Sequence, residues 1–177
     1  MLSIASLIEY RHKREKLIKE FSVSEFTHNL GKFRLHTFRS ILDERIHYVL
    51  SFGKWTKSKT PMIRVQTANV VSDVLGYSSK GGSRNSVNDS LSAIVSHGCG
   101  ALLYLEPRRN DSHGSGLKSP SESPKLPVMD FRDYGIGAQI LAALGISKLV
   151  LLSRDRRRVI GLEGYGLEII KRVTLPS

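Results

Sequence analysis

The stretch DFRDYGIGAQILAALGISKLVLLSRDRRRVIGLEGYGLEIIKRV, residues 130–173, decides the fold. Its apolar residues recur first at helical spacing and then in short continuous runs. The pattern predicts a helix over 135–144, a strand over 148–152, a helix over 156–163 and a strand over 167–173. Gly145 ends the first helix, because glycine adopts the left-handed conformation without a Cβ clash. Strand, helix and strand with short links predict a right-handed crossover and a parallel pair.

The sequence upstream predicts antiparallel strands and one more helix. Residues 31–39 and 46–52 alternate between apolar and polar side chains, and Asp43-Glu44 between them suits a turn, so a hairpin is expected. A helix over 85–97 is followed by a buried strand over 101–105. The fold class expected is therefore α/β with an α+β tendency.

Composition limits the classes of function. The 177 residues suffice for one domain with a real core, and no apolar run approaches the ~20 residues that span a bilayer. The single cysteine excludes an intramolecular disulfide and a multi-cysteine metal cage, and it favours a cytoplasmic location. The net charge of +11 favours an anionic partner. No nucleic-acid-binding motif is present, so nucleic acid is not the expected partner, and a nucleotide triphosphate is a smaller anion that would serve equally.

Residues 130–141, DFRDYGIGAQIL, and residues 161–169, GLEGYGLEI, resemble the C-terminal signature of GTP cyclohydrolase II, the riboflavin-pathway enzyme. The resemblance implies a GTP cyclohydrolase II-like fold, with antiparallel N-terminal strands before a C-terminal βαβ unit. It also implies a homodimer. GTP, or another phosphate-bearing ligand bound weakly, is the ligand that it suggests.

The N-terminal segment reads as a basic amphipathic helix over residues 3–20. It resembles the closing segment of dihydroxybutanone phosphate synthase, which is often fused ahead of GTP cyclohydrolase II. We therefore expect a linker over 1–28 and the cyclohydrolase-like domain over 29–177. This resemblance makes a synthase domain or protein a possible partner, and it leaves open whether Met1 is a natural start.

The family's metal ligands are not matched. GTP cyclohydrolase II holds zinc with three thiolates, and the zinc lowers the pKa of the attacking water. Asn69 stands where the family's first zinc-binding cysteine belongs, and residues 78–85, SSKGGSRN, contain neither of the other two. Neutral amide and hydroxyl groups bind zinc poorly. We therefore expect no metal and no cofactor.

Other family positions persist. By resemblance, Asp130 matches the presumed proton acceptor and Arg132 the arginine proposed to attack the α-phosphate. Arg64 begins a segment that contacts the nucleotide phosphates, Ser153 replaces a threonine, and Arg158 replaces a nucleotide-contacting lysine. Alternatively, Asp130 and Arg132 form a structural ion pair at the start of a helix, and the arginine run around Arg158 is a solvated surface.

Several features carry two interpretations each. Residues 106–128, rich in proline, serine and glycine, are predicted to be a loop without its own core, the alternative being a lid that folds on ligand. Cys99 is interpreted as a structural residue rather than a nucleophile. His36 and His47 are interpreted as exposed strand residues rather than metal ligands.

Two functions follow from the sequence. The first is an interaction or regulatory domain with a GTP cyclohydrolase II-like fold that has lost its metal chemistry. The second is an active hydrolase with an altered metal site, which acts on GTP or a relative. The lack of thiolates favours the first, because a stable core needs no metal whereas the reaction does.

Overall fold

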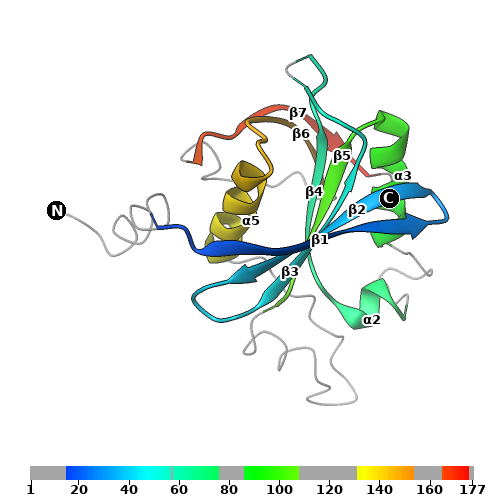
Figure 1. The fold of residues 1–177 in the computed structure, drawn as a ribbon. Helices are drawn as coiled ribbons and strands as arrows, with labels where there is room; N and C mark the ends of the chain where they lie inside the picture. The colour runs from blue at the N-terminus through cyan, green and yellow to red at the C-terminus, as the bar shows by residue number, and fades with distance from the viewer. Residues whose placement is uncertain (1–14, 57, 76–85, 108–130, 154–164, 176–177) are drawn as a thin grey trace, which may run out of the picture.

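The computed structural model describes residues 15–56, 58–75, 86–107, 131–153 and 165–175, and all structural statements concern these residues. Seven strands and three helices follow one another along this part of the chain (Figure 1). In order they are β1 Ile18–His28, β2 Gly31–Ser40, β3 Ile46–Phe52, β4 Met62–Thr67, α2 Val70–Asp73, α3 Ser86–His97, β5 Gly100–Leu105, α5 Phe131–Ala143, β6 Lys148–Ser153 and β7 Glu168–Thr174.

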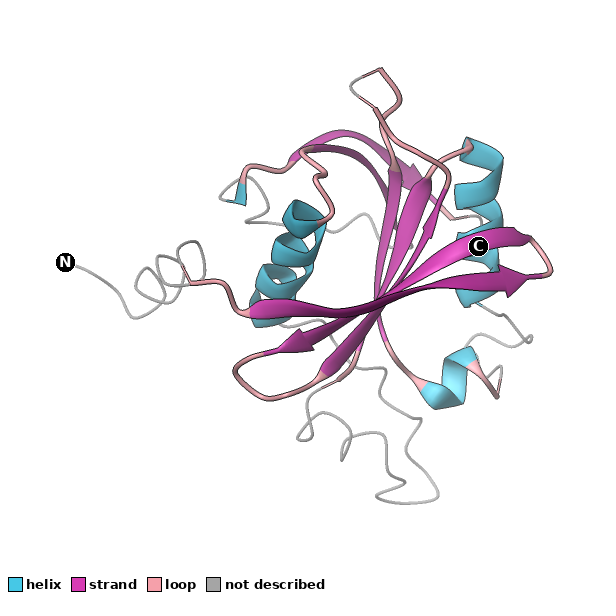
Figure 2. Ribbon diagram, in the orientation of Figure 1, coloured by secondary structure: helices cyan, strands magenta, loops and turns pink. Residues whose placement is uncertain are grey.

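The strands form one mixed sheet, ordered β1-β2-β3-β5-β4-β6-β7 (Figure 2). β1, β2 and β3 pair antiparallel with their neighbours, and β3 pairs antiparallel with β5. β5, β4, β6 and β7 run parallel to one another. The fold is thus the expected α/β arrangement, with antiparallel strands before a parallel C-terminal unit.

A helix covers each face of the sheet. α5 packs through Ile136 and Ile140 on a cluster that includes Leu103 and Leu149. α3 packs through Leu91 and Ile94 on a second cluster on the opposite face. Figure 1 shows α5 (yellow) and α3 (green) on either side of the strands. Side chains of each strand therefore alternate between two cores.

Side chains of β2 pack on both faces of the sheet. Phe33 and Phe38 are an odd number of positions apart, so they point to opposite sides of the strand. Phe33 joins the cluster under α3, and Phe38 joins the cluster under α5. Both are almost completely buried.

Most predicted elements are confirmed. The predicted hairpin is formed by β2 and β3, and the helix predicted over 85–97 is α3. The predicted C-terminal strands, β6 and β7, pair in parallel. Gly145 has a φ of +71° after α5, as expected for the residue that ends a helix. α5 begins at Phe131, earlier than the predicted residue 135.

The predicted N-terminal helix over residues 3–20 is wrong at its end. Its last three residues belong to β1, which pairs with β2 along its whole length. β1 also places residues 18–28, assigned to the linker, within the sheet. The reason is physical: a strand that pairs with a twisted hairpin gains ladder hydrogen bonds, which outweigh a weak helical periodicity. Residues 15–17 of that predicted helix are described and are not helical, whereas residues 3–14, the predicted helix over 156–163 and most of the predicted loop 106–128 lie outside the described residues.

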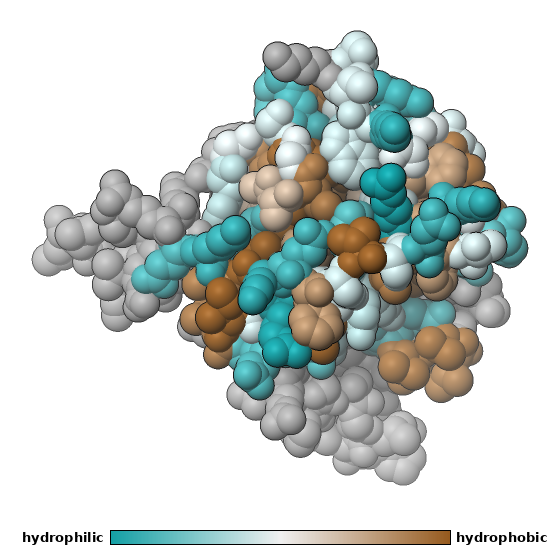
Figure 3. Space-filling view, viewed as in Figure 1, coloured by the Kyte–Doolittle hydropathy of each residue, from teal (hydrophilic) through white to brown (hydrophobic). Residues whose placement is uncertain are grey.

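One surface feature of the fold stands out. α2 exposes Val70, and its C-cap residue Val74 and the following residue Leu75 are also largely exposed. A hydrophobic cluster is visible at the position of α2 in Figure 3. Among the described residues, no helix is long and apolar enough to cross a membrane.

Candidate functional site

The carboxyl ends of the parallel strands collect polar side chains. β4 ends at Thr67, β5 at Leu105 and β6 at Ser153, all at one edge of the sheet. β3 runs the opposite way, and its Tyr48 lies opposite Tyr104, so β3 begins at this same edge. Ligands of open α/β sheets bind outside the carboxyl ends of the strands, so this edge is the candidate site.

Arg64 and Ser153 belong to adjacent strands near this edge. Arg64 of β4 lies opposite Leu152 of β6, and its Nη1 donates to the Leu152 carbonyl at 3.4 Å. Ser153 is the next residue along β6, and both Arg64 and Ser153 are half-buried. Two of the five predicted site residues therefore lie on adjacent strands, with their side chains on opposite faces of the sheet.

The other three predicted residues are placed incompletely. Arg132 lies in the first turn of α5, but its side chain is outside the described part of the structure. Asp130 and Arg158 lie outside it altogether. The catalytic and phosphate-binding roles of these three residues stay predictions.

Asn69 serves as a helix cap. Its side-chain Oδ1 accepts hydrogen bonds from the backbone N–H groups of Val71 and Ser72, at 3.0 and 3.1 Å. Its backbone is extended, with φ −144° and ψ 104°, as N-cap residues usually are. The residue that the resemblance places at a zinc-binding cysteine position therefore starts α2.

Asp73, at the end of α2, is buried at the centre of a polar network. One carboxylate oxygen accepts from Gln66 Nε2 at 2.8 Å and from Ser72 Oγ at 2.9 Å. The other accepts from the backbone N–H of Asn69 at 3.0 Å and from Tyr104 Oη at 2.8 Å. Burial, followed by the hydrogen bond and negative charge of Asp73, raises the pKa of Tyr104, so the phenol remains a donor.

A second polar cluster was missed by the sequence analysis. Arg45, just before β3, donates through Nε to Asp43 at 2.8 Å and through Nη1 to the Glu106 carbonyl at 2.8 Å. The Glu106 carboxylate accepts from the backbone N–H of Ile46 at 2.7 Å. The Glu106 N–H donates to Nδ1 of His47 at 3.2 Å. Together these contacts fix the first residue after β5.

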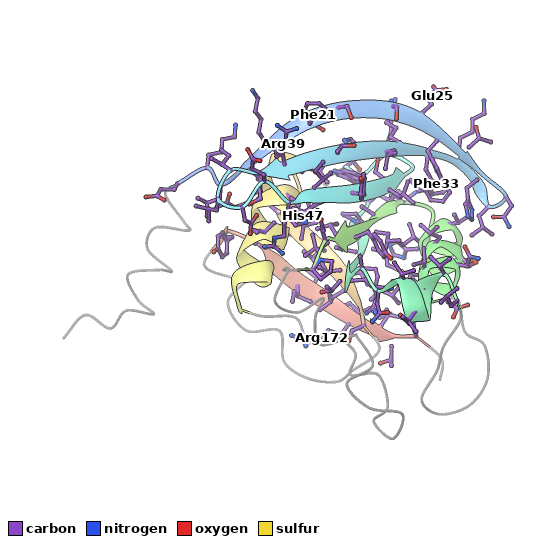
Figure 4. The ribbon with its side chains drawn as sticks, turned by 90° about the horizontal axis from the view of Figure 1, so that it is seen from below. Phe21, Glu25, Phe33, Arg39, His47 and Arg172 are labelled. Carbon is purple, nitrogen blue, oxygen red and sulfur yellow. The ribbon has the colours of Figure 1, made fainter. Side chains whose placement is uncertain are left out.

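The interpretation of both histidines as exposed strand residues is wrong. His47 is completely buried, and burial, aided by the positive charge of Arg45, lowers its pKa to about 4. His36 has a side-chain exposure of only 12% and contacts Glu20 and Ser51 at 2.9 and 3.0 Å. The sequence did hold a signal for His47, because it lies two residues before the apolar Val49 and therefore shares its buried face. Figure 4 shows His47 below the start of β3.

Cys99 occupies a structural position. It is fully buried beside the start of β5, and its Sγ lies 3.8 Å from the Thr60 carbonyl. Burial raises the pKa of the thiol, although Lys59 acts in the opposite direction. A thiol that resists ionisation is a poor nucleophile and a poor zinc ligand, which agrees with the structural interpretation.

Comparison with known proteins identifies the family. The family model of GTP cyclohydrolase II matches residues 19–174. The chain belongs to the GTP cyclohydrolase II family. A riboflavin biosynthesis protein RibBA of Synechocystis is 31% identical over 99% of this chain and 34% of its own length. The monofunctional riboflavin biosynthesis protein RIBA 2 of Arabidopsis thaliana is 34% identical over 99% of this chain and 38% of its own length.

A solved structure has the same fold. RibBX of A. baumannii, described as a two-domain 3,4-dihydroxy-2-butanone 4-phosphate synthase, matches 98% of this chain and 44% of its own with a TM-score of 0.61. Its sequence identity to this chain is 21%, so the likeness establishes the fold alone. The chain spans about a third to two fifths of the length of the curated relatives described above.

The described residues at the family's metal position do not fit zinc. The Asn69 oxygen already accepts two backbone hydrogen bonds, and the Asp73 oxygens accept two each. No group of three or more histidine, cysteine or acidic residues within the described ranges could hold a metal ion. Cys99, the only cysteine of the whole chain, is buried beside β5. The donor set is therefore neutral or already saturated, whereas zinc prefers thiolate, imidazole and free carboxylate ligands.

Proposed function

We propose that this GTP cyclohydrolase II-like domain has lost the zinc-dependent reaction of its family and acts as an interaction or regulatory domain in riboflavin biosynthesis. The observation that carries the proposal is the role of Asn69. A side chain whose only carbonyl oxygen caps a helix cannot also supply the charge that a zinc-bound water needs. The proposed location is the cytoplasm, which the single cysteine favours.

The proposed partner is a dihydroxybutanone phosphate synthase, fused or separate. Two observations support it: relatives of this chain include proteins described as bifunctional, and the solved structure with this fold is described as a two-domain synthase. A homodimer is proposed as well, from the resemblance to the family.

The synthase proposal is tested by adding the purified chain to the synthase of the same organism. The expected result is a saturable change in synthase turnover, together with a complex of defined mass in analytical ultracentrifugation. If the two proteins sediment independently at micromolar concentrations and turnover is unchanged, the partner is wrong.

Residual binding of phosphate-bearing ligands belongs to the proposal. Arg64 and Ser153 lie on adjacent strands toward the carboxyl ends of β4 and β6, where ligands bind in open sheets, and Arg64 supplies a positive charge there. Charge-assisted bonds recognise charge rather than base, so GTP, ATP and pyrophosphate should bind weakly and with little preference. Binding should weaken with salt because the charges are partly exposed. Calorimetric titrations at two salt concentrations test this, and a tenfold preference for GTP, ~1.4 kcal/mol, would indicate a guanine pocket.

The alternative function is a hydrolase with an altered metal site, which would release formate and pyrophosphate from GTP. The family membership favours it, whereas the donor set at Asn69 and Asp73 does not. Formate release from GTP, measured with and without added zinc, separates the two functions. The proposal expects no release above the protein-free control under either condition.

A further inference from the structure

The turn between β2 and β3 exposes two large apolar side chains. Ile41 and Leu42 follow directly after the last residue of β2, Ser40, and they are 60% and 62% exposed. Turns of this kind usually contain glycine, asparagine, aspartate, serine or proline, each of which suits the turn backbone. Two adjacent aliphatic residues therefore point to a surface that another molecule covers. We call Ile41 and Leu42 the turn patch.

The backbone that leads into β1 is fixed beside this patch. The side-chain amide of Gln139, on α5, binds it twice: Oε1 accepts from the Leu17 N–H at 2.8 Å, and Nε2 donates to the Glu15 carbonyl at 3.0 Å. From the other side, the Ile41 N–H donates to the Leu17 carbonyl at 2.8 Å. Residues 15–17 are therefore held between α5 and the turn that carries the patch.

This clamp sets where a preceding domain meets the sheet. The curated relatives are longer than the stretch that this chain matches, and one is described as bifunctional. In a fusion with the synthase ahead, the synthase reaches this domain at Glu15, next to the turn patch. The 14 residues before Glu15 span at most about 50 Å when fully extended. A domain tethered so closely has an effective concentration on the order of millimolar at the patch.

We propose that the turn patch is the surface on which the dihydroxybutanone phosphate synthase docks, an inference that rests on the partner given under the proposed function. The neighbouring side chains suit a protein interface. Lys19 and Arg39 lie opposite each other on β1 and β2, and the Arg39 guanidinium carbon is 5.1 Å from the ring centroid of Phe21 (Figure 4). Phe21 is itself 66% exposed. Aromatic residues and arginine are enriched in interfaces, around a centre that is poor in charge.

Calorimetric titration of the full chain into the synthase of the same organism tests the inference. The double variant Ile41→Ser, Leu42→Ser should weaken the affinity at least about tenfold, because truncation of central apolar contacts is costly. The matched control is Val74→Ser, Leu75→Ser, which removes two apolar residues that are 73% exposed beside α2 and should leave the affinity unchanged. Both variants should keep the thermal midpoint of the unmodified chain, because all four side chains are exposed.

The outcomes separate this inference from the proposed function. If the unmodified chain binds the synthase and the turn-patch variant binds it equally well, the partner is right and the docking surface is wrong. If the unmodified chain does not bind the synthase, the partner is wrong and the inference fails with it. Sedimentation of each protein alone covers the remaining occupant: if the turn-patch variant converts a dimer to a monomer, a second copy of this chain covers the patch and the inference is overturned.

Discussion

Acid should destabilise this protein through His47, a buried imidazole whose pKa is lowered to about 4 from the ordinary 6.5. Its Nδ1 accepts from the Glu106 N–H, so the ring is neutral in the folded protein and carries its proton on Nε2. The unfolded chain binds a proton near pH 6.5, whereas the folded chain resists it until about pH 4. The contribution of His47 is thus fully present above 6.5 and is lost as pH falls toward 4.

The magnitude follows from the two pKa values. Full loss, below pH ~4, corresponds to about 3 kcal/mol of unfolding free energy. At about pH 5 the unfolded chain is almost fully protonated at this residue and the folded chain is not, so the loss is about 2 kcal/mol. That is a large share of the 5–15 kcal/mol by which domains are typically stable.

Urea unfolding of the unmodified chain and of His47→Asn between about pH 7 and pH 4.5 measures this term. The asparagine oxygen can accept from the Glu106 N–H near the place of Nδ1, but it does not titrate. The difference between the two proteins should therefore change by about 2 kcal/mol from pH 7 to pH 5. A difference that stays constant over this range, or an NMR titration of His47 near 6.5, would refute the reasoning.

Three further outcomes are expected. Gly100→Ala should yield a chain that unfolds at much lower temperature or does not fold, because a Cβ at Gly100 would collide with the Met62 carbonyl oxygen; an unchanged thermal midpoint would show that the β4–β5 contact can open. Lys148→Ala should cost less than about 1 kcal/mol in chemical denaturation, because both members of its pair with Glu168 are exposed. Arg45→Met should cost more, about 2 kcal/mol, because it leaves the Glu106 carbonyl without its buried donor and removes the charged partner of the exposed Asp43, and equal costs for the two variants would contradict this assignment.

The fold was predictable where the spacing of apolar residues and the position of a turn-forming glycine agree. α3, β5 and β6 each have a clear spacing of apolar residues and a glycine at or near one end, and each lies where the sequence predicts it. β1 was not predictable, because an edge strand that is exposed over most of its length lacks the alternation that marks a half-buried strand. Its identity depends on pairing with β2, a tertiary contact that no local pattern contains.

The site was predictable only in part, for a similar reason. Resemblance singled out Arg64 and Ser153, and the parallel pairing of β4 with β6 places them on adjacent strands but on opposite faces of the sheet. The cluster of Arg45, His47 and Glu106 joins residues about sixty positions apart, so no sequence motif marks it. The residue type of Asn69 was compatible with a helix cap, because asparagine is among the preferred N-cap residues, but no sequence pattern marked the start of α2.

The central claim, that this domain has exchanged the metal of its family for a hydrogen-bonded cap, is tested most directly by zinc content. Protein purified without chelator should contain far less than one equivalent of zinc per chain, as measured by elemental mass spectrometry. The Asn69 and Asp73 oxygens are already saturated, so zinc added in excess should be removed by simple gel filtration. Near-stoichiometric zinc that only strong chelation removes would contradict the account.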